Sequence, residues 1–297
     1  MKYLFYQVDV FTNTPFGGNP LAVFMDGDGL TDEAMQKIAK EMNLSETTFI
    51  LSPGKLLADF SIRIFTPEKE LSFAGHPTLG TAHILRETGK VPMGDHIIKL
   101  AMKAGIINVI QKHKENLLFM VQRLPEFRLP LNYAKEISDI LGISKSFINS
   151  SSYPIQIVST GLPVLMVPII SLNALKKITV DINKLKKILA NLGTDIIYVF
   201  TQQTIHSNAS IHSRAFAPDL GISEDPATGS AAGAMGAYLF KNKVISNHAC
   251  KNICIEQGYQ MGRPSSLHVE VEQEDNEIKS ILVGGESVTV IEGWVNI

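Results

Sequence analysis

Apolar and polar residues follow two different periods along this chain. Alternation with a period of two predicts strands, most clearly at residues 3–10, 59–65 and 267–271. Apolar residues at the helical period follow Thr31 and Asp181, two good N-cap residues, and predict two amphipathic helices. The chain is therefore expected to combine many short strands with a few helices.

Weaker signals extend this pattern. A short helix is predicted over residues 133–141, and Gly193 is a typical signal for the end of the second amphipathic helix. A glycine-broken loop is expected at residues 258–265. The further predicted strands cover residues 21–24, 45–50, 155–159, 165–170, 281–283 and 288–291, with a meander over 97–120 that turns at 112–116.

Small residues dominate one helical stretch, residues 227–239, which follows Asp225 and Pro226. Acidic, serine and threonine residues before such a run signal a helix start, and proline is tolerated in the first turn. Because small side chains let other segments approach from all sides, this stretch predicts a buried central helix. Its start, with Thr228, Gly229 and Ser230, offers unpaired N–H groups and a partial positive charge to an anion. A buried helix with an acidic cap and no ligand explains this stretch equally well.

An internal duplication favours a ligand site at this helix start over a buried helix without a ligand. Residues 63–67 and 214–218 share the pattern Arg-x-Phe-x-Pro, 151 positions apart. Seven residues after each proline lie segments 74–78 and 225–229, and each leads into a small-residue helix, the first expected at 77–88. Two copies of one unit predict two similar halves rather than a repeat array.

Fainter similarities support the duplication and place a boundary. Residues 18–23 resemble 161–166, and residues 46–50 resemble 195–199. A length of 297 residues suits two domains, and the proline-bounded segment 124–130 is the best linker. We therefore predict an N-terminal half over 1–125 together with 285–297, and a C-terminal half over 126–284.

Composition excludes several classes of protein. Apolar residues make up 45% and charged residues 19%, which allows two sizeable cores. The formal net charge of −2 gives no reason to expect a nucleic acid or an anionic membrane as partner. The longest apolar stretch is broken by Pro163 and Pro168 and is too short to span a bilayer. With no secretory signal at its start, the protein is expected to be cytoplasmic.

Only a few ionisable residues are candidates for a catalytic site. If the two halves pack about a pseudo-twofold axis, Glu46, His76 and Asp225 would meet in a cleft beside the two central helix starts, a plausible acid–base arrangement for a small anionic substrate. Each residue also has a structural explanation: Glu46 as a strand-edge carboxylate, His76 and Asp225 as helix caps. The duplicated Arg63 and Arg214 are expected to hold loops by ion pairing. Cys250 and Cys254 lack a second pair, so neither zinc nor a disulfide is expected.

Three blocks of sequence resemble one known family. Residues 45–49 (Ser-Glu-Thr-Thr-Phe), 73–82 (Phe-Ala-Gly-His-Pro-Thr-Leu-Gly-Thr-Ala) and 224–231 (Glu-Asp-Pro-Ala-Thr-Gly-Ser-Ala) look like the signature blocks of the PhzF-like phenazine-biosynthesis isomerases. Shorter matches lie at residues 8–11, 17–20, 257–258 and 262–265, so the resemblance covers almost the whole chain in the same order.

The resemblance implies a fold, an oligomeric state and roles for the site residues. The fold is the diaminopimelate-epimerase type, an α+β fold of two pseudo-symmetric halves, each a curved, mainly antiparallel sheet wrapped around a central helix. Members of the family need no cofactor or metal and are usually homodimers. By resemblance, Glu46 is the general acid/base, and His76 and Asp225 are its polar partners. Gly75, Gly229 and Ser230 would hold the carboxylate of the substrate, and Thr228 is expected to be a substrate-binding residue with them.

One difference from related enzymes narrows the chemistry. Similar epimerases and racemases carry a cysteine at the start of each central helix, where this chain has Ala74 and the Asp225–Pro226–Ala227 turn. Two-thiol racemisation is therefore not expected. We expect a cofactor-independent isomerase that moves a proton and a double bond on a small cyclic or amino-substituted carboxylate. The alternatives are an amino-acid epimerase or racemase that uses the carboxylate–histidine set, and a protein that binds carboxylates without turnover.

Overall fold

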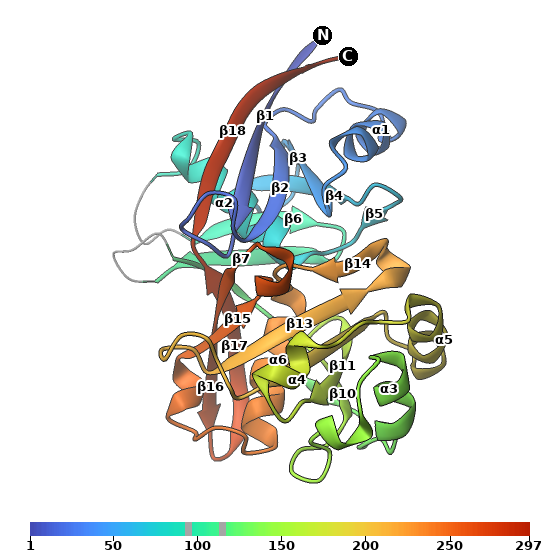
Figure 1. Ribbon diagram of the computed structural model, residues 1–297. Helices are drawn as coiled ribbons and strands as arrows, with labels where there is room; N and C mark the ends of the chain where they lie inside the picture. Colours follow the sequence, from blue (N-terminus) through green and yellow to red (C-terminus); the bar gives the residue numbers. More distant parts are fainter. Residues whose placement is uncertain (93–96, 113–116) are drawn as a thin grey trace. The chain divides into compact units, whose positions relative to one another are not determined.

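The computed structural model describes residues 1–92, 97–112 and 117–297, so most of the predicted turn at 112–116 lies outside the described residues. The chain forms two compact units: unit 1 is Met1–Val121 with Gly284–Ile297, and unit 2 is Gln122–Val283. Figure 1 shows the elements of both units. The domain boundaries expected at 125 and 284 stay predictions for independently folding parts.

Unit 1 is a mostly antiparallel sheet around one central helix. Its elements are β1 (Lys2–Val10), β2 (Asn19–Phe24), α1 (Asp32–Met42), β3 (Glu46–Leu51), β4 (Phe60–Phe65), β5 (Glu70–Leu71), α2 (Gly75–Glu87), β6 (Ile98–Met102), β7 (Gly105–Gln111), β8 (Leu118–Val121) and β18 (Ser287–Asn296). Strand β1 pairs antiparallel with both β18 and β2, whereas the pairs β2–β3 and β4–β6 are parallel. Helix α2 packs against β1, β2, β3, β7 and β8, so the sheet curves around it.

Local chemistry explains the two helices of unit 1. Thr31 caps α1 as expected, because its Oγ1 accepts from the Ala34 N–H at 3.2 Å. Helix α2 starts at Gly75 rather than at Pro77, so Pro77 lies in the first turn, where its missing N–H costs nothing. A Cβ on Gly80 would lie 2.7 Å from Leu21 Cδ2, so a larger residue here would force the Leu21 side chain to shift where α2 approaches β2.

Unit 2 repeats this plan. Its elements are β9 (Glu126–Phe127), α3 (Ala134–Ile140), η1 (Lys145–Phe147), β10 (Gln156–Ser159), β11 (Pro163–Pro168), α4 (Leu172–Lys176), α5 (Ile182–Leu192), β12 (Ile196–Thr201), β13 (Ile211–Ala217), η2 (Pro218–Leu220), β14 (Ile222–Asp225), α6 (Gly229–Lys241), η3 (Ala249–Lys251), β15 (Ile253–Gln257), η4 (Tyr259–Met261), β16 (Ser265–Glu274) and β17 (Glu277–Gly285), the last of which ends in unit 1. Helix α6 packs against β10, β11 and β16. Apolar side chains from α3, α4 and α5 form a second core with β10, β11 and β12.

Two predictions for unit 2 can be compared directly with its structure. Asp181 caps α5 by accepting from the Lys184 N–H at 3.1 Å, and Gly193 ends the helix with φ of 63°, both as expected. The segment 124–130, predicted as a linker, instead contributes β9, which pairs with β10 inside unit 2. Proline at each end of this segment does not prevent a two-residue strand at its centre.

The duplication is confirmed, but two of the predicted correspondences are shifted. The order β2-α1-β3-β4-β5-α2-β6 in unit 1 matches β11-α5-β12-β13-β14-α6-β15 in unit 2, with the same parallel and antiparallel pairings. In the ladders, Phe49 pairs with Arg63 and Val199 pairs with Arg214. The unit 2 counterpart of Glu46 is therefore Ile196, not Asp195.

A second shift lies between the arginines and the central helices. Arg63 holds Glu70 and Arg214 holds Glu224, each through two hydrogen bonds. Asp225 directly follows Glu224, so its counterpart is Leu71, and both 13-residue central helices then begin four residues later with glycine. The proposed match of segment 74–78 with 225–229 is wrong, because the loop that contains η2 is longer in unit 2.

The helices that the structure describes include none that is both long enough and apolar enough to cross a membrane.

Candidate active site

Glu46 and His76 come together inside unit 1. Glu46 is the first residue of β3, and His76 is the second residue of α2. Both are buried, and His76 Nε2 lies 3.4 Å from Glu46 Oε2. Glu46 is therefore not an exposed strand-edge carboxylate. Gly75, the first residue of α2, is buried next to His76.

The imidazole of His76 is neutral at physiological pH. Burial disfavours its charged form and lowers the pKa of His76 to about 3. A neutral imidazole donates from one ring nitrogen and accepts at the other. The pair is thus a neutral hydrogen-bonding group beside a carboxyl group, and His76 can support either protonation state of Glu46. The N-cap position of α2 belongs to Ala74, so His76 is not the cap of this helix.

Asp225 and Thr228 come together inside unit 2. Asp225 is the last residue of β14 and pairs with Ala215 in β13. The Thr228 hydroxyl donates to Asp225 Oδ2 at 2.5 Å, and both residues are buried. Two expectations are corrected here: Asp225 belongs to a strand rather than to a helix cap, and Pro226 lies before α6 rather than in its first turn. Thr228 occupies the N-cap position, but its side chain does not cap the helix, because its hydroxyl bonds to Asp225 instead.

The start of α6 places the other predicted binding residues. Gly229 is its first residue and buried, and Ser230 is its second and half-buried. Ser230 thus holds the position in α6 that His76 holds in α2. The first N–H groups of a helix have no partner within it and carry partial positive charge. This end of α6 has the chemistry to hold a carboxylate.

Sequence reasoning gave no role to Gln257, although it lies under this helix start. Gln257 is the last residue of β15, fully buried, and its side chain reaches Asp225, Thr228 and Tyr198. The strand around it is buried at every position, so no alternation of polar and apolar residues marks its orientation. Apart from the short family match at residues 257–258, which assigns no role, no signal in the sequence distinguishes this glutamine from a surface residue.

The duplicated arginines have the predicted structural role. Arg63 binds Glu70 at 2.9 and 2.7 Å, and Arg214 binds Glu224 at 2.8 Å through each of two nitrogens. Each guanidinium also lies 5.1 Å from the ring centre of the phenylalanine two residues later. Both arginines therefore fix the hairpin that leads into a central helix.

The two cysteines are free, buried thiols. Burial raises the pKa of Cys254 to about 11, so this side chain is protonated at neutral pH and a poor nucleophile. Within the described part of the chain, no cluster of three or more His, Cys, Asp or Glu side chains is suited to a metal ion.

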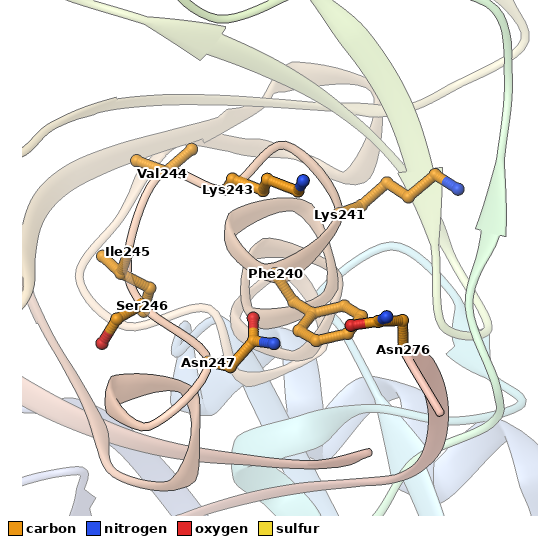
Figure 2. A pocket seen from close by; sticks show the side chains of 8 residues that line it. All are labelled: Phe240, Lys241, Lys243, Val244, Ile245, Ser246, Asn247 and Asn276. Atoms are coloured by element: carbon orange, nitrogen blue, oxygen red, sulfur yellow. The ribbon is translucent and has the colours of Figure 1, made fainter. Parts of the chain in front are cut away.

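A pocket of about 680 Å³ lies at the opposite end of α6 (Figure 2). Its lining residues are Phe240, Lys241, Lys243, Val244, Ile245, Ser246, Asn247 and Asn276. Of these eight, none is acidic or a histidine, and none belongs to the predicted site. A 13-residue helix is about 20 Å long, so this pocket is far from Thr228 and Gly229.

Known proteins match this chain over nearly its full length. An uncharacterized isomerase of Clostridium acetobutylicum is 37% identical over 97% of this chain and 96% of its own length. A trans-2,3-dihydro-3-hydroxyanthranilate isomerase of Pseudomonas fluorescens is 35% identical over 97% of both chains. The crystal structure of a PhzF-family phenazine biosynthesis protein of Bacillus anthracis superimposes with a TM-score of 0.91 at 29% identity and covers both chains completely.

These similarities confirm the expected mixed fold with a large curved sheet, and they confirm the expectation of an isomerase, since relatives of the same length are named isomerases. The family described as phenazine biosynthesis-like protein, PhzC-PhzF, matches residues 8–293. The chain belongs to this phenazine biosynthesis-like family.

Proposed function

We propose that this protein is a cofactor-independent isomerase that moves a proton, and with it a double bond, on a small cyclic or amino-substituted carboxylate. The observation that carries the proposal is the buried contact of 3.4 Å between His76 Nε2 and Glu46 Oε2 at the start of α2. Burying a carboxyl group and an imidazole costs free energy, and buried titratable pairs of this kind are typical of functional sites. The isomerase names of the relatives agree with proton transfer as that task.

Glu46 is the proposed general acid and base. Its carboxylate takes a proton from one carbon of the substrate, and the electrons of that C–H bond shift the double bond. The Glu46 carboxyl group then returns the proton to a second carbon, so the reaction is balanced without a redox partner. The neutral imidazole of His76 stabilises each protonation state of Glu46 by donating or accepting a hydrogen bond.

The helix starts are the proposed carboxylate-binding groups. Gly75 begins α2, and Gly229 and Ser230 begin α6. Their N–H groups and the helix dipoles favour an anion. By resemblance to the family, Asp225 is proposed to orient a polar substituent of the substrate. From family membership we also propose a homodimer, which light scattering of the purified protein would test.

Proton NMR in deuterated water tests this function. Wild type, Glu46→Gln and the control Glu41→Gln, an exposed glutamate of α1, would each meet a panel of small unsaturated and amino carboxylates. The panel includes trans-2,3-dihydro-3-hydroxyanthranilate, the substrate in the name of the Pseudomonas fluorescens relative. We expect wild type and Glu41→Gln to form the isomer, with deuterium at the new C–H position to the extent that the Glu46 carboxyl group exchanges its proton with the solvent before returning it.

For Glu46→Gln we expect a rate lower by about 10²- to 10⁴-fold, the usual contribution of positioned acid–base catalysis, with an unchanged circular dichroism spectrum. A Glu46→Gln variant with wild-type turnover would remove Glu46 from the mechanism. Binding of carboxylates by wild type without product or exchange would instead support a carboxylate-binding protein.

A further inference from the structure

A buried hydrogen-bond network lies under the start of α6 in unit 2. It consists of Tyr198, Ser213, Asp225, Thr228 and Gln257, and Gln257 is at its centre. Tyr198, Ser213 and Gln257 are completely buried. A buried polar group without a hydrogen-bond partner costs free energy, so each group in the network must be paired. The donor and acceptor roles of one group therefore restrict those of its neighbours.

The orientation of the Gln257 amide is fixed by two backbone groups. The Thr228 N–H can only donate, and it meets Gln257 Oε1 at 3.3 Å. The Asp225 carbonyl can only accept, and it meets Gln257 Nε2 at 2.7 Å. A flipped amide would place oxygen against oxygen and N–H against N–H. The Tyr198 hydroxyl, which donates to Oε1 at 2.9 Å, agrees with the same orientation.

This orientation determines where the Thr228 hydroxyl proton points. The second N–H of the Gln257 amide donates to Thr228 Oγ1 at 3.0 Å. Because Thr228 Oγ1 accepts there, its own proton is free to point at Asp225 Oδ2, 2.5 Å away. The result is a directed chain from amide to hydroxyl to carboxylate. The hydroxyl and the N–H of Thr228 are both used inside the protein, which argues against Thr228 as a donor to substrate.

Unit 1 provides an internal comparison, because its equivalent positions are mostly apolar. The parallel pairs Ser61–Ala101 and His212–Glu256 align β6 with β15, so the counterpart of Gln257 is Met102. The counterparts of Tyr198, Ser213, Asp225 and Thr228 are Thr48, Ile62, Leu71 and Ala74. The same architecture thus forms without this network, so the fold alone does not account for it.

We propose that Gln257 is a positioning residue for Asp225 and acts through the hydroxyl of Thr228. The chain of bonds fixes one oxygen of the Asp225 carboxylate and thereby its orientation. Thr228 is then a positioning residue too, rather than a substrate-binding one. The inference rests on the proposed function, in which Asp225 orients the substrate.

A first test needs no substrate. A hydroxyl proton held by a buried carboxylate exchanges slowly with water, so Thr228 should give its own proton NMR resonance, assigned by its loss in Thr228→Val. Gln257→Met introduces the residue that unit 1 uses, and we expect it to abolish this resonance. Gln122→Met is the matched control, because Gln122 is also buried and donates to Gly229 O at 3.0 Å without joining the chain.

The resonance should therefore survive in Gln122→Met even if that variant loses as much thermal stability as Gln257→Met. Absence of the resonance in wild type would overturn the directed chain. Its persistence in Gln257→Met would overturn the role of Gln257.

A second test uses turnover of trans-2,3-dihydro-3-hydroxyanthranilate. We expect Thr228→Val and Gln257→Met each to lower kcat by about 10-fold or more with little change in KM, since orientation rather than binding is lost. Because both act on one bond, the double variant should be no slower than the slower single variant. Thr228→Ser keeps the hydroxyl and should restore kcat. Losses that multiply in the double variant would contradict the proposal.

Asp225→Asn separates this inference from the proposed function. If Asp225→Asn is inactive while Gln257→Met and Thr228→Val keep the wild-type kcat, the inference fails and the function stands. If wild type itself gives no turnover, the proposed function fails for this substrate. If Asp225→Asn turns over like wild type, the isomerase function stands but Asp225 does not orient the substrate, and the inference loses its catalytic part. The hydroxyl resonance then still decides whether Gln257 directs Thr228 toward Asp225.

Discussion

His76 Nε2, in the first turn of α2, lies 3.4 Å from Glu46 Oε2, and both side chains are buried. Burial keeps the imidazole neutral, with the pKa of His76 lowered from 6.5 to about 3. Below pH 6.5, His76 of the unfolded chain therefore binds a proton, whereas His76 of the folded protein stays unprotonated until the pH approaches 3. This difference links the candidate site to the stability of the whole unit.

We expect His76 to make the protein less stable in mild acid. A histidine with a lowered folded pKa contributes stability above its unfolded pKa of 6.5 and loses it as the pH falls toward about 3. Between pH 7.5 and 5 this loss is about 2 kcal/mol in the free energy of unfolding. Urea unfolding at both pH values would measure it.

The matched comparison is between His76→Asn and His248→Asn. His248 is exposed, so its replacement should leave the pH dependence of wild type unchanged. In His76→Asn, the free energy of unfolding should fall by about 2 kcal/mol less than in wild type between pH 7.5 and pH 5, because the titrating group is gone. An equal pH dependence in wild type and His76→Asn would show that His76 is not held neutral.

The two duplicated arginines should differ in their contribution to stability. Arg214 is 8% exposed and also donates to the carbonyls of Leu175 and Ile178, whereas Arg63 is 22% exposed. Lysine keeps the charge but cannot make the two parallel bonds to a carboxylate. We expect Arg214→Lys to lower the free energy of unfolding by about 3 kcal/mol, and Arg63→Lys by about 1 kcal/mol.

Denaturant unfolding of both variants, with Lys186→Ala as a surface control, would test this order. Lys186 forms a partly exposed ion pair with Asp219, which is expected to be worth less than about 1 kcal/mol. Equal losses for Arg63→Lys and Arg214→Lys would mean that the buried carbonyl contacts of Arg214 add nothing.

The cysteines should be dispensable. Cys250 and Cys254 are buried, and the pKa of Cys254 is raised to about 11, so few thiolates exist at neutral pH. We expect a thiol reagent to label the native protein far more slowly than the urea-unfolded protein. The Cys250→Ala/Cys254→Ala variant should keep its turnover. Loss of turnover in a folded double variant would bring thiol chemistry back into consideration.

Local signals in the sequence were sufficient for much of the fold. Thr31 and Asp181 were predicted as caps from their residue type and the apolar period after them, and both cap their helices. The shared Arg-x-Phe-x-Pro pattern revealed the duplication because the same ion pair fixes the same hairpin in both units. These features depend on neighbours a few positions away, which a sequence displays directly.

Features that depend on register were not accessible in the same way. A single offset of 151 aligned segment 74–78 with 225–229, although the longer η2 loop makes Gly75 the counterpart of Gly229. Gln257 joins Asp225 and Thr228 from 29 or more positions away, through a strand without alternation. Only the paired strands bring these groups together. The individual site residues could be named from sequence, but the bonds that orient them could not.

Strand β18 has a consequence for how the protein is made. Nine residues of β1, Lys2 to Val10, pair with β18, which lies after the whole of unit 2 in the chain. On the ribosome, unit 2 can become complete while β1 still lacks this neighbour. The unit that begins the chain is therefore expected to finish folding last, with an open strand edge that a chaperone would need to shield during synthesis.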